Sequence, residues 1–191
     1  MTNFHYKLFK PYGYLSQFVN NTTKRKNKKL LGELFPFPDG TMAIGRLDEP
    51  SEGLLLLTTD GKLSEYIRSA KVEKEYYVQV DGAIDAEALE KLKYGVLIST
   101  EDGPYTTLPA AVALLGSPPI LPERAKKIRD VRHGPTTWIS IVISEGKFRQ
   151  VRKMTAAVGY PTLRLVRFRI GTYTIESMEA GEVIKIHSPK Y

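Results

Sequence analysis

Four consecutive leucines at residues 54–57 constrain the fold of this chain more than any other feature. The run is too short for a helix, and it lies between Gly53 and a turn-forming sequence at residues 59–61. A short apolar run with such boundaries predicts a strand that is buried on both faces. The turn before it carries Asp48, two residues after Arg46. We therefore expect the Asp48 carboxylate at the rim of a core, where a side chain can face a cleft.

An isolated aspartate in a turn also has a simpler interpretation. Its side chain often caps the turn, and here it has Arg46 as a nearby partner for an ion pair. This structural alternative stays open on the turn alone. The rest of the chain favours a functional role.

Composition excludes several classes of site. The chain has 191 residues and no cysteine, which rules out disulfides, cysteine zinc sites and cysteine nucleophiles. Its three histidines, His5, His133 and His187, lack metal-ligand spacing, and there is no glycine-rich phosphate loop. No metal and no nucleotide cofactor are expected. No signal peptide precedes the first strand and no apolar run approaches the ~18 residues of a membrane span. We expect a soluble cytoplasmic protein that does not contact membranes.

Positive charge is unevenly distributed along the chain. The formal net charge is +7, and no acid lies between residues 147 and 169. Such asymmetry indicates a polyanionic partner, most simply nucleic acid, although solvated surface faces are the alternative. The basic residues form three groups: Lys24, Arg25, Lys26, Lys28 and Lys29; Arg124, Lys126, Lys127, Arg129 and Arg132, partly offset by Glu123 and Asp130; and Lys147, Arg149, Arg152, Lys153, Arg164, Arg167 and Arg169.

Short strands outnumber helices in the pattern, and the helices are short. This predicts an α+β fold built on a mostly antiparallel sheet. In the helix over 148–158, Val151 and Met154 share one face, so Gln150, Arg152 and Lys153 are expected to point elsewhere. We expect strands at 4–10, 42–44, 54–57, 75–80, within 96–115, at 138–144 and after Pro161, helices at 63–69, 85–93 and 148–158, and surface loops at 20–29 and 117–135.

Taken together and in order, several segments resemble the RsuA-type pseudouridine synthases. Within that family the chain is most similar to the RluE type, because of residues 7–13 and the proline-rich loop that runs into 135–138. The chain departs from the usual family pattern at Ser51, where threonine is common, and at Phe148, where asparagine is common. The matching segments are residues 45–48, 51–58, 74–78, 145–154 and 159–171.

The resemblance implies a pseudouridine synthase catalytic fold: a mostly antiparallel mixed sheet with short flanking helices and two lobes around a central cleft. It also implies a cofactor-independent, metal-free isomerisation. The substrate would be a flipped uridine in large-subunit (23S) rRNA. The chain would be a single catalytic domain over residues 1–191, without the N-terminal S4 module of many relatives. A monomer is expected.

The resemblance also implies the roles of individual residues. Asp48 would be the essential catalytic acid residue, as a nucleophile or as a base. A carboxylate in a dry pocket needs a cation to offset desolvation, and Arg152 is the matching arginine, with phosphate binding as its alternative. Tyr76 would stack on the flipped base, with a core tyrosine on the strand as the alternative. Substrate contacts would come from Arg46, Lys74, Arg149, Gln150, Lys153, Arg164 and, as a pocket wall, Leu165.

Two other functions fit parts of this pattern. A non-catalytic rRNA-binding or ribosome-assembly factor on the same fold would use the same basic loops. A glycosidic hydrolase acting on nucleotides would need a second carboxylate across the bond, and nothing marks Glu49 or Glu52 as that partner.

Overall fold

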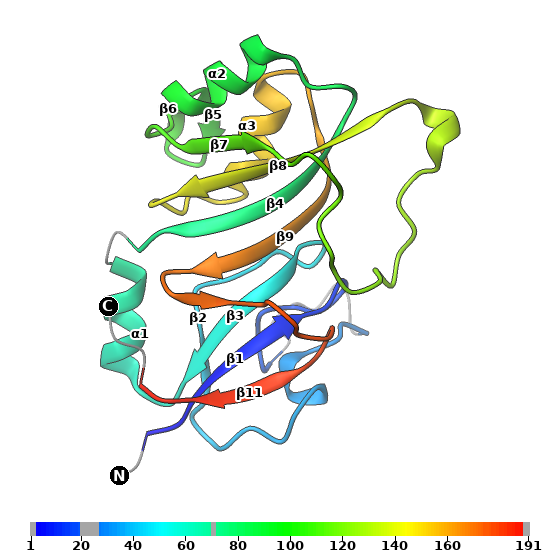
Figure 1. The fold of residues 1–191 in the computed structure, drawn as a ribbon. Coiled ribbons are helices and arrows are strands. Elements are labelled where there is room, and N and C mark those ends of the chain that lie inside the picture. Colours follow the sequence, from blue (N-terminus) through cyan, green and yellow to red (C-terminus); the bar gives the residue numbers. More distant parts are fainter. Residues whose placement is uncertain (1–2, 20–26, 70–71, 189–191) are drawn as a thin grey trace. The chain divides into compact units, whose positions relative to one another are not determined.

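The computed structural model describes residues 3–19, 27–69 and 72–188. They fall into two compact units, both drawn in Figure 1. Unit 1 comprises Met1–Val72, Pro122–Lys126 and Arg167–Tyr191, and unit 2 comprises Glu73–Leu121 and Lys127–Val166. The chain therefore passes between the units four times, after Val72, Leu121, Lys126 and Val166. The expectation of one domain over 1–191 stays a prediction.

Unit 1 is built on antiparallel strands around β1 and β3. β1 pairs antiparallel with β3 on one side and with β11 on the other, and β2 pairs antiparallel with β3. Helix α1 packs against β2 and β3. The elements are β1 (His5–Lys10), the 3₁₀ turn η1 (Leu31–Glu33), β2 (Met42–Ile44), β3 (Glu52–Thr58), α1 (Gly61–Ser69) and β11 (Val183–Ile186).

The leucine run is the centre of this unit, as predicted. Every residue of β3 is buried, because the strand lies inside the sheet and is covered on its faces. Leu55 and Leu57 join Tyr6 and Leu8 of β1 and Leu31 of η1 in one hydrophobic cluster. Aromatic rings close that cluster, with edge contacts between Tyr6 and Phe37 (5.4 Å between centroids) and between Phe18 and Phe37 (5.3 Å).

Unit 2 is built on a second antiparallel set of strands. β8 pairs with β4 on one side and with β7 on the other, while β5 and β6 form a separate hairpin. Helix α2 packs against β7, and α3 packs against β5. The elements are β4 (Lys74–Asp81), α2 (Ala86–Tyr94), β5 (Leu97–Thr100), β6 (Gly103–Thr106), β7 (Ala111–Leu114), the 3₁₀ turn η2 (Val131–His133), β8 (Thr136–Ile143) and α3 (Gln150–Ala157).

Local chemistry sets the start of α2. Asp85 is its N-cap, and its carboxylate accepts a hydrogen bond of 2.8 Å from the Ala88 amide. This bond is the largest of the interactions that lower the pKa of Asp85, and a bond from the Tyr160 hydroxyl adds to it.

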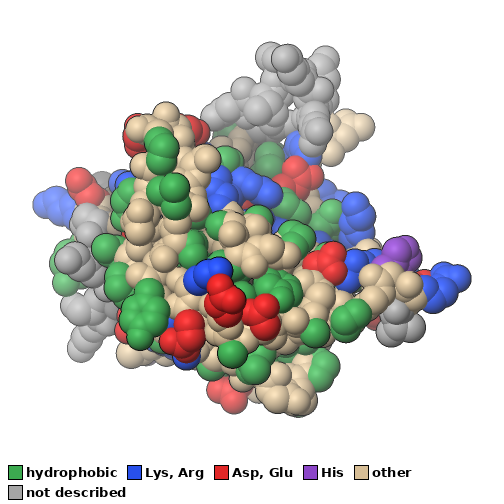
Figure 2. Space-filling view, turned by 90° about the horizontal axis from the view of Figure 1, so that it is seen from above, with side chains coloured by type: hydrophobic (Ala, Val, Ile, Leu, Met, Phe, Trp, Pro, Cys, Tyr) green, Lys and Arg blue, Asp and Glu red, His purple; other side chains and the backbone are tan. Residues whose placement is uncertain are grey.

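On the face that carries α2, charged side chains of both signs are mixed (Figure 2). Helix α2 itself carries the ion pairs Lys91–Glu87 and Lys93–Glu90. That face is therefore no single-sign surface for a polyanion.

Strand β9 (Thr162–Ile170) begins in unit 2 and ends in unit 1, and β10 (Tyr173–Thr174) pairs antiparallel with its end. The strand follows Pro161, as expected. The α+β class, the strands and the three helices are thus confirmed, and their bounds differ from the predicted ones by a few residues. One detail was wrong: Gln150 of α3 is buried, with 3% of it exposed.

Candidate active site

Asp48 lies in the turn between β2 and β3 and is half-buried. The backbone on both sides of it is fixed by hydrogen bonds. The Ser16 hydroxyl accepts from the Leu47 amide (2.9 Å) and donates to the Leu47 carbonyl (2.8 Å). The Gly13 amide donates to the Glu49 carbonyl (2.9 Å). The backbone that carries Asp48 is therefore held in place before any substrate arrives.

A second support comes from Arg167, of which 3% is exposed. Its guanidinium donates to the Leu54 carbonyl (2.7 Å) and to the Arg46 carbonyl (3.4 Å), on either side of the Asp48 turn. Gly53 makes this approach possible. Its φ is +103°, and a Cβ at this position would lie 2.3 Å from the Arg167 carbonyl oxygen. Only glycine fits here.

A buried lysine lies in the same region. Lys10, at the end of β1, is 0% exposed, and its ammonium donates to the carbonyls of Pro11 (3.0 Å) and Tyr14 (2.7 Å). Burial lowers the pKa of Lys10 to about 7, while the carboxylates of Glu52 and Asp48 act in the opposite direction. The half-buried Asp48 turn therefore has a buried lysine in its electrostatic surroundings.

The other acids of this turn have partners. Glu52 forms an ion pair of 3.1 Å with Arg124, and only 3% and 11% of the two side chains are exposed. The Arg124 guanidinium also stacks on the Tyr12 ring, 4.3 Å from its centroid. Glu49 pairs with Lys28. Arg124 belongs to the second basic group, and its cation is used inside unit 1.

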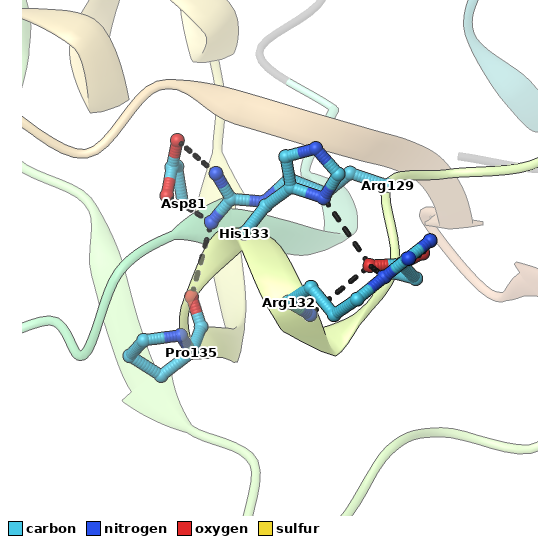
Figure 3. Close-up of polar contacts among 6 residues, drawn as sticks. Asp81, Arg129, Arg132, His133 and Pro135 are labelled. Carbon is cyan, nitrogen blue, oxygen red and sulfur yellow. Dashed lines mark hydrogen bonds and ion pairs between the residues drawn. The ribbon is translucent and has the colours of Figure 1, made fainter.

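The remaining arginines of the 124–132 group are also neutralised locally (Figure 3). Arg129 forms a two-point ion pair with Asp81, and Arg132 donates from Nε to both oxygens of Asp130, at 3.1 and 3.0 Å. His133 lies 3.3 Å from the same carboxylate. Bonds from Arg132 lower the pKa of Asp130. In the sequence, only Asp130 and Glu123 lie near these cations. The partners of Arg124 and Arg129, Glu52 and Asp81, are distant in the sequence and could not be identified from it.

The first basic group lies largely outside the described residues, which exclude 20–26. Of its described members, Lys28 pairs with Glu49, and Lys29 lies 5.4 Å from the centroid of the Tyr14 ring. Lys126 and Lys127 of the second group are exposed.

In unit 2, Tyr76 lies on β4 and is 8% exposed, on the strand face that also carries the buried Val78 and Val80. Lys74 shares this face and is half-buried. On β9, Leu165 is 5% exposed and Arg164 is 9% exposed. Arg164 therefore offers little surface to a phosphate.

Helix α3 and the turn before it carry the other predicted residues. Arg152 and Lys153 are partly exposed, and Arg149 is exposed and adopts the left-handed conformation at the N-cap (φ +54°). The Gln150 amide is used inside the unit, because it accepts from the Lys147 amide (2.9 Å) and donates to Glu145. The observed role of Gln150 is thus to hold the turn.

The candidate residues are divided between the units: Asp48 and Arg46 lie in unit 1, and Tyr76 and Arg152 lie in unit 2. The ion pair of Asp48 with Arg152 and the role of Tyr76 stay predictions. Sequence reasoning missed Ser16, Lys10 and Arg167. No local pattern marks a serine that binds a turn thirty residues away, and a lysine before a proline is ordinarily solvated.

Among residues 3–19, 27–69 and 72–188, no three His, Asp or Glu side chains gather in a group able to hold a metal ion. No helix in the same part of the chain is long and apolar enough to span a membrane.

The chain has clear relatives of known name. It is 46% identical to "Ribosomal large subunit pseudouridine synthase E" of Xanthomonas campestris, over 92% of this chain and 91% of the relative. It is 45% identical to the protein of the same name from Vibrio parahaemolyticus, over 91% of this chain and 69% of the relative. It is 30% identical to "Ribosomal large subunit pseudouridine synthase B" of Bacillus subtilis, over 93% and 66%.

Solved structures agree with the sequence relatives. A crystal structure of a pseudouridylate synthase superposes with a TM-score of 0.76 at 26% identity, covering 97% of this chain and 71% of that one. A chain of a Cbf5-Nop10-Gar1 complex shares the fold at a TM-score of 0.62 and 13% identity, over 92% of this chain and 51% of that one. The model of the RNA pseudouridylate synthase family matches residues 6–157. The chain belongs to the RNA pseudouridylate synthase family.

Proposed function

We propose that this protein converts one specific uridine of large-subunit rRNA into pseudouridine, with Asp48 as the essential acidic residue. The observation that carries the proposal is the Asp48 turn. Its carboxylate is half-buried on a backbone that Ser16 and Arg167 hold on both sides. The names of the relatives at 45% and 46% identity support the choice of large-subunit rRNA.

The reaction needs no external atoms. The bond between N1 of uracil and C1′ of ribose breaks, the base turns, and a new bond forms from C5 to C1′. C5 loses its proton and N1 carries one in the product, so the sum is an isomerisation. An ionised carboxylate serves such a reaction either by attacking the sugar or base or by removing a proton from the ribose. Both roles stay open for Asp48.

Two side chains of unit 2 complete the proposal. The Arg152 guanidinium would offset the charge of Asp48 in a dry pocket, since an arginine stays charged and presents a planar fork to a carboxylate. The Tyr76 ring would stack on the extruded uracil. Both roles are proposed from the family motif, and both residues lie on regular elements, α3 and β4, that fix their backbones.

The test is a pseudouridine-specific primer-extension stop assay on unmodified large-subunit rRNA. Wild-type protein should create one new stop, and Asp48→Asn should not. Asp39→Asn, at an exposed position of unit 1, is the matched control and should behave as wild type. If wild type gives no stop on free RNA or on assembly intermediates, the protein is an RNA-binding factor on this fold. Release of free uracil would instead indicate a hydrolase.

A further inference from the structure

The turn before α3 exposes an aromatic ring between cations. Phe148 is 62% exposed, and its neighbours Lys147 and Arg149 are exposed as well. No acid occurs from residue 147 to residue 169. Single exposed apolar side chains are common on protein surfaces, so the ring alone would carry no conclusion. A binding role follows from the fixed backbone of this turn and the cations placed around the ring.

The backbone of this turn is fixed from the inside of unit 2. The Gln150 side chain, buried in the unit, accepts from the Lys147 amide (2.9 Å), and the Gln150 amide donates to the Lys147 carbonyl (3.1 Å). Glu145 accepts from the Gln150 side chain, from the Tyr105 hydroxyl (2.6 Å) and from the Leu108 amide (2.9 Å). The nearest acid is thus consumed inside, and the turn is preorganised, which lowers the ordering cost of binding.

The cations on both sides of the ring are also placed. The Lys147 ammonium lies 4.7 Å from the centroid of the Tyr105 ring, and the Lys153 ammonium lies 5.3 Å from the centroid of the Phe148 ring. Lys153 donates to the Ser99 carbonyl at 2.7 Å, which anchors it. Arg149 adopts a left-handed conformation that non-glycine residues rarely take, and such strain clusters at functional sites.

The chemistry of this surface selects one kind of ligand. A phenyl ring has no hydrogen-bonding group, so it cannot read a base edge or hold a phosphate. Its flat face can stack on any unpaired base, while the ammonium and guanidinium groups beside it bind the phosphates on either side of that base. A double helix does not expose such a face, so the ligand is a single-stranded or looped segment.

We propose that Phe148 stacks on an unpaired base of the RNA substrate other than the modified uridine, with Lys147 and Arg149 on the adjoining phosphates. This inference rests on the proposed function for the identity of the RNA. It adds a binding subsite on unit 2 and makes Phe148 a residue that selects looped over paired substrate.

The test compares four variants at position 148 with wild type in binding to a large-subunit rRNA fragment that contains the modified uridine and its loop. Phe148→Ala and Phe148→Leu should weaken binding roughly tenfold or more, while Phe148→Tyr and Phe148→Trp should stay near wild type, because stacking needs an aromatic face. Tyr94→Ala is the matched control. It removes an exposed aromatic side chain of unit 2, 78% exposed, next to the Lys93–Glu90 pair, and should leave binding unchanged.

Salt dependence separates stacking from charge. Phe148→Ala should lower affinity while leaving the slope of log K against log salt unchanged, whereas Lys147→Ala should reduce that slope by about one. 2-Aminopurine placed in turn at each loop position should be quenched at one position by wild type and not by Phe148→Ala. The inference would be overturned if Phe148→Ala bound the RNA as tightly as wild type, or if Phe148→Leu and Phe148→Tyr bound it with equal affinity.

Failure of this inference is distinguishable from failure of the proposed function. If wild type modifies the RNA and Phe148→Ala binds it as tightly as wild type does, only the stacking subsite is rejected. Absence of modification by wild type, together with aromatic-dependent binding at position 148, rejects the enzymatic proposal and leaves the subsite standing. Circular dichroism melts of each variant show whether an altered affinity comes from a folded protein.

Discussion

The Asp48 turn of unit 1 and the 147–150 turn of unit 2 both combine charge with a backbone locked by hydrogen bonds, yet they differ in where the charge goes. Around Asp48 the neighbouring groups Lys10, Arg124 and Arg167 are buried or nearly so and contact protein atoms. Beside the 147–150 turn, the half-buried Glu145 is hydrogen-bonded within unit 2, and Lys147 and Arg149 are exposed. The comparison teaches that a fixed inward charge suits chemistry on one group, and an outward charge suits capture of a polyanion.

The largest effect should come from Asp48→Asn. The substitution removes the carboxylate's charge but keeps its shape, so modification of rRNA should fall at least about a thousandfold. RNA affinity should stay near wild type, because the proposed phosphate contacts are made by the outward cations and not by Asp48. Primer extension and filter binding on the same preparations measure the two quantities. A parallel loss of affinity would place Asp48 in binding and erase the contrast between the two turns.

Gly53→Ala tests how tightly the inward turn is built. The new Cβ would meet the Arg167 carbonyl at 2.3 Å with φ at +103°, so the free energy of unfolding should drop by about 3 kcal/mol or more. Gly45→Ala is the control, since it has positive φ (+73°) but nothing within 4 Å of its Cβ, and should cost about 1 kcal/mol. Urea melts measure both. If both variants lose the same free energy of unfolding, backbone strain and not the contact with Arg167 is the reason for glycine at position 53.

Arg124→Ala should destabilise the protein by about 3 kcal/mol, because it leaves Glu52 charged and nearly buried without its ion pair. Arg132→Ala is the matched control, because Arg132 lies in the same loop between β7 and β8. Its side chain is 84% exposed, so loss of its pair with Asp130 should have no measurable effect on thermal unfolding. If the two variants melt alike, the contact of Arg124 with Tyr12 and Glu52 does not stabilise unit 1.

Lys10→Met should change how stability depends on pH. An unfolded lysine holds its proton up to a pKa of about 10.5, but the buried one only up to about 7. Between these values the unfolded state binds more protons, so the free energy of unfolding should rise with pH, by at most about 1.4 kcal/mol per unit. Below pH 7 both states are protonated and this dependence ends. Lys10→Met should flatten the rise, and the exposed control Lys62→Met should keep it.

Much of the fold was predictable because it depends on local patterns. The leucine run predicted β3, and the Asp85 cap predicted α2, since burial on both faces and N-capping leave signatures within a few residues. The candidate acid was identified from its turn and its family motif. In contrast, the ion pairs of Arg124 and Arg129 were not predictable, because their partners Glu52 and Asp81 lie far away in the sequence. Charge counted along a chain does not show which cations remain for a ligand.

The position of β1 has a consequence for synthesis of the protein. β1 leaves the ribosome before all of unit 2, and one of its two neighbours, β11, leaves only after unit 2. Until β11 arrives, one edge of β1 carries unpaired amides and carbonyls, and such edges recruit other strands. Unit 2 ends at Val166, so it is complete before unit 1 receives its last segment. A nascent chain that ends near that point holds one complete unit and one sheet with an open edge, and such edges are prone to aggregate.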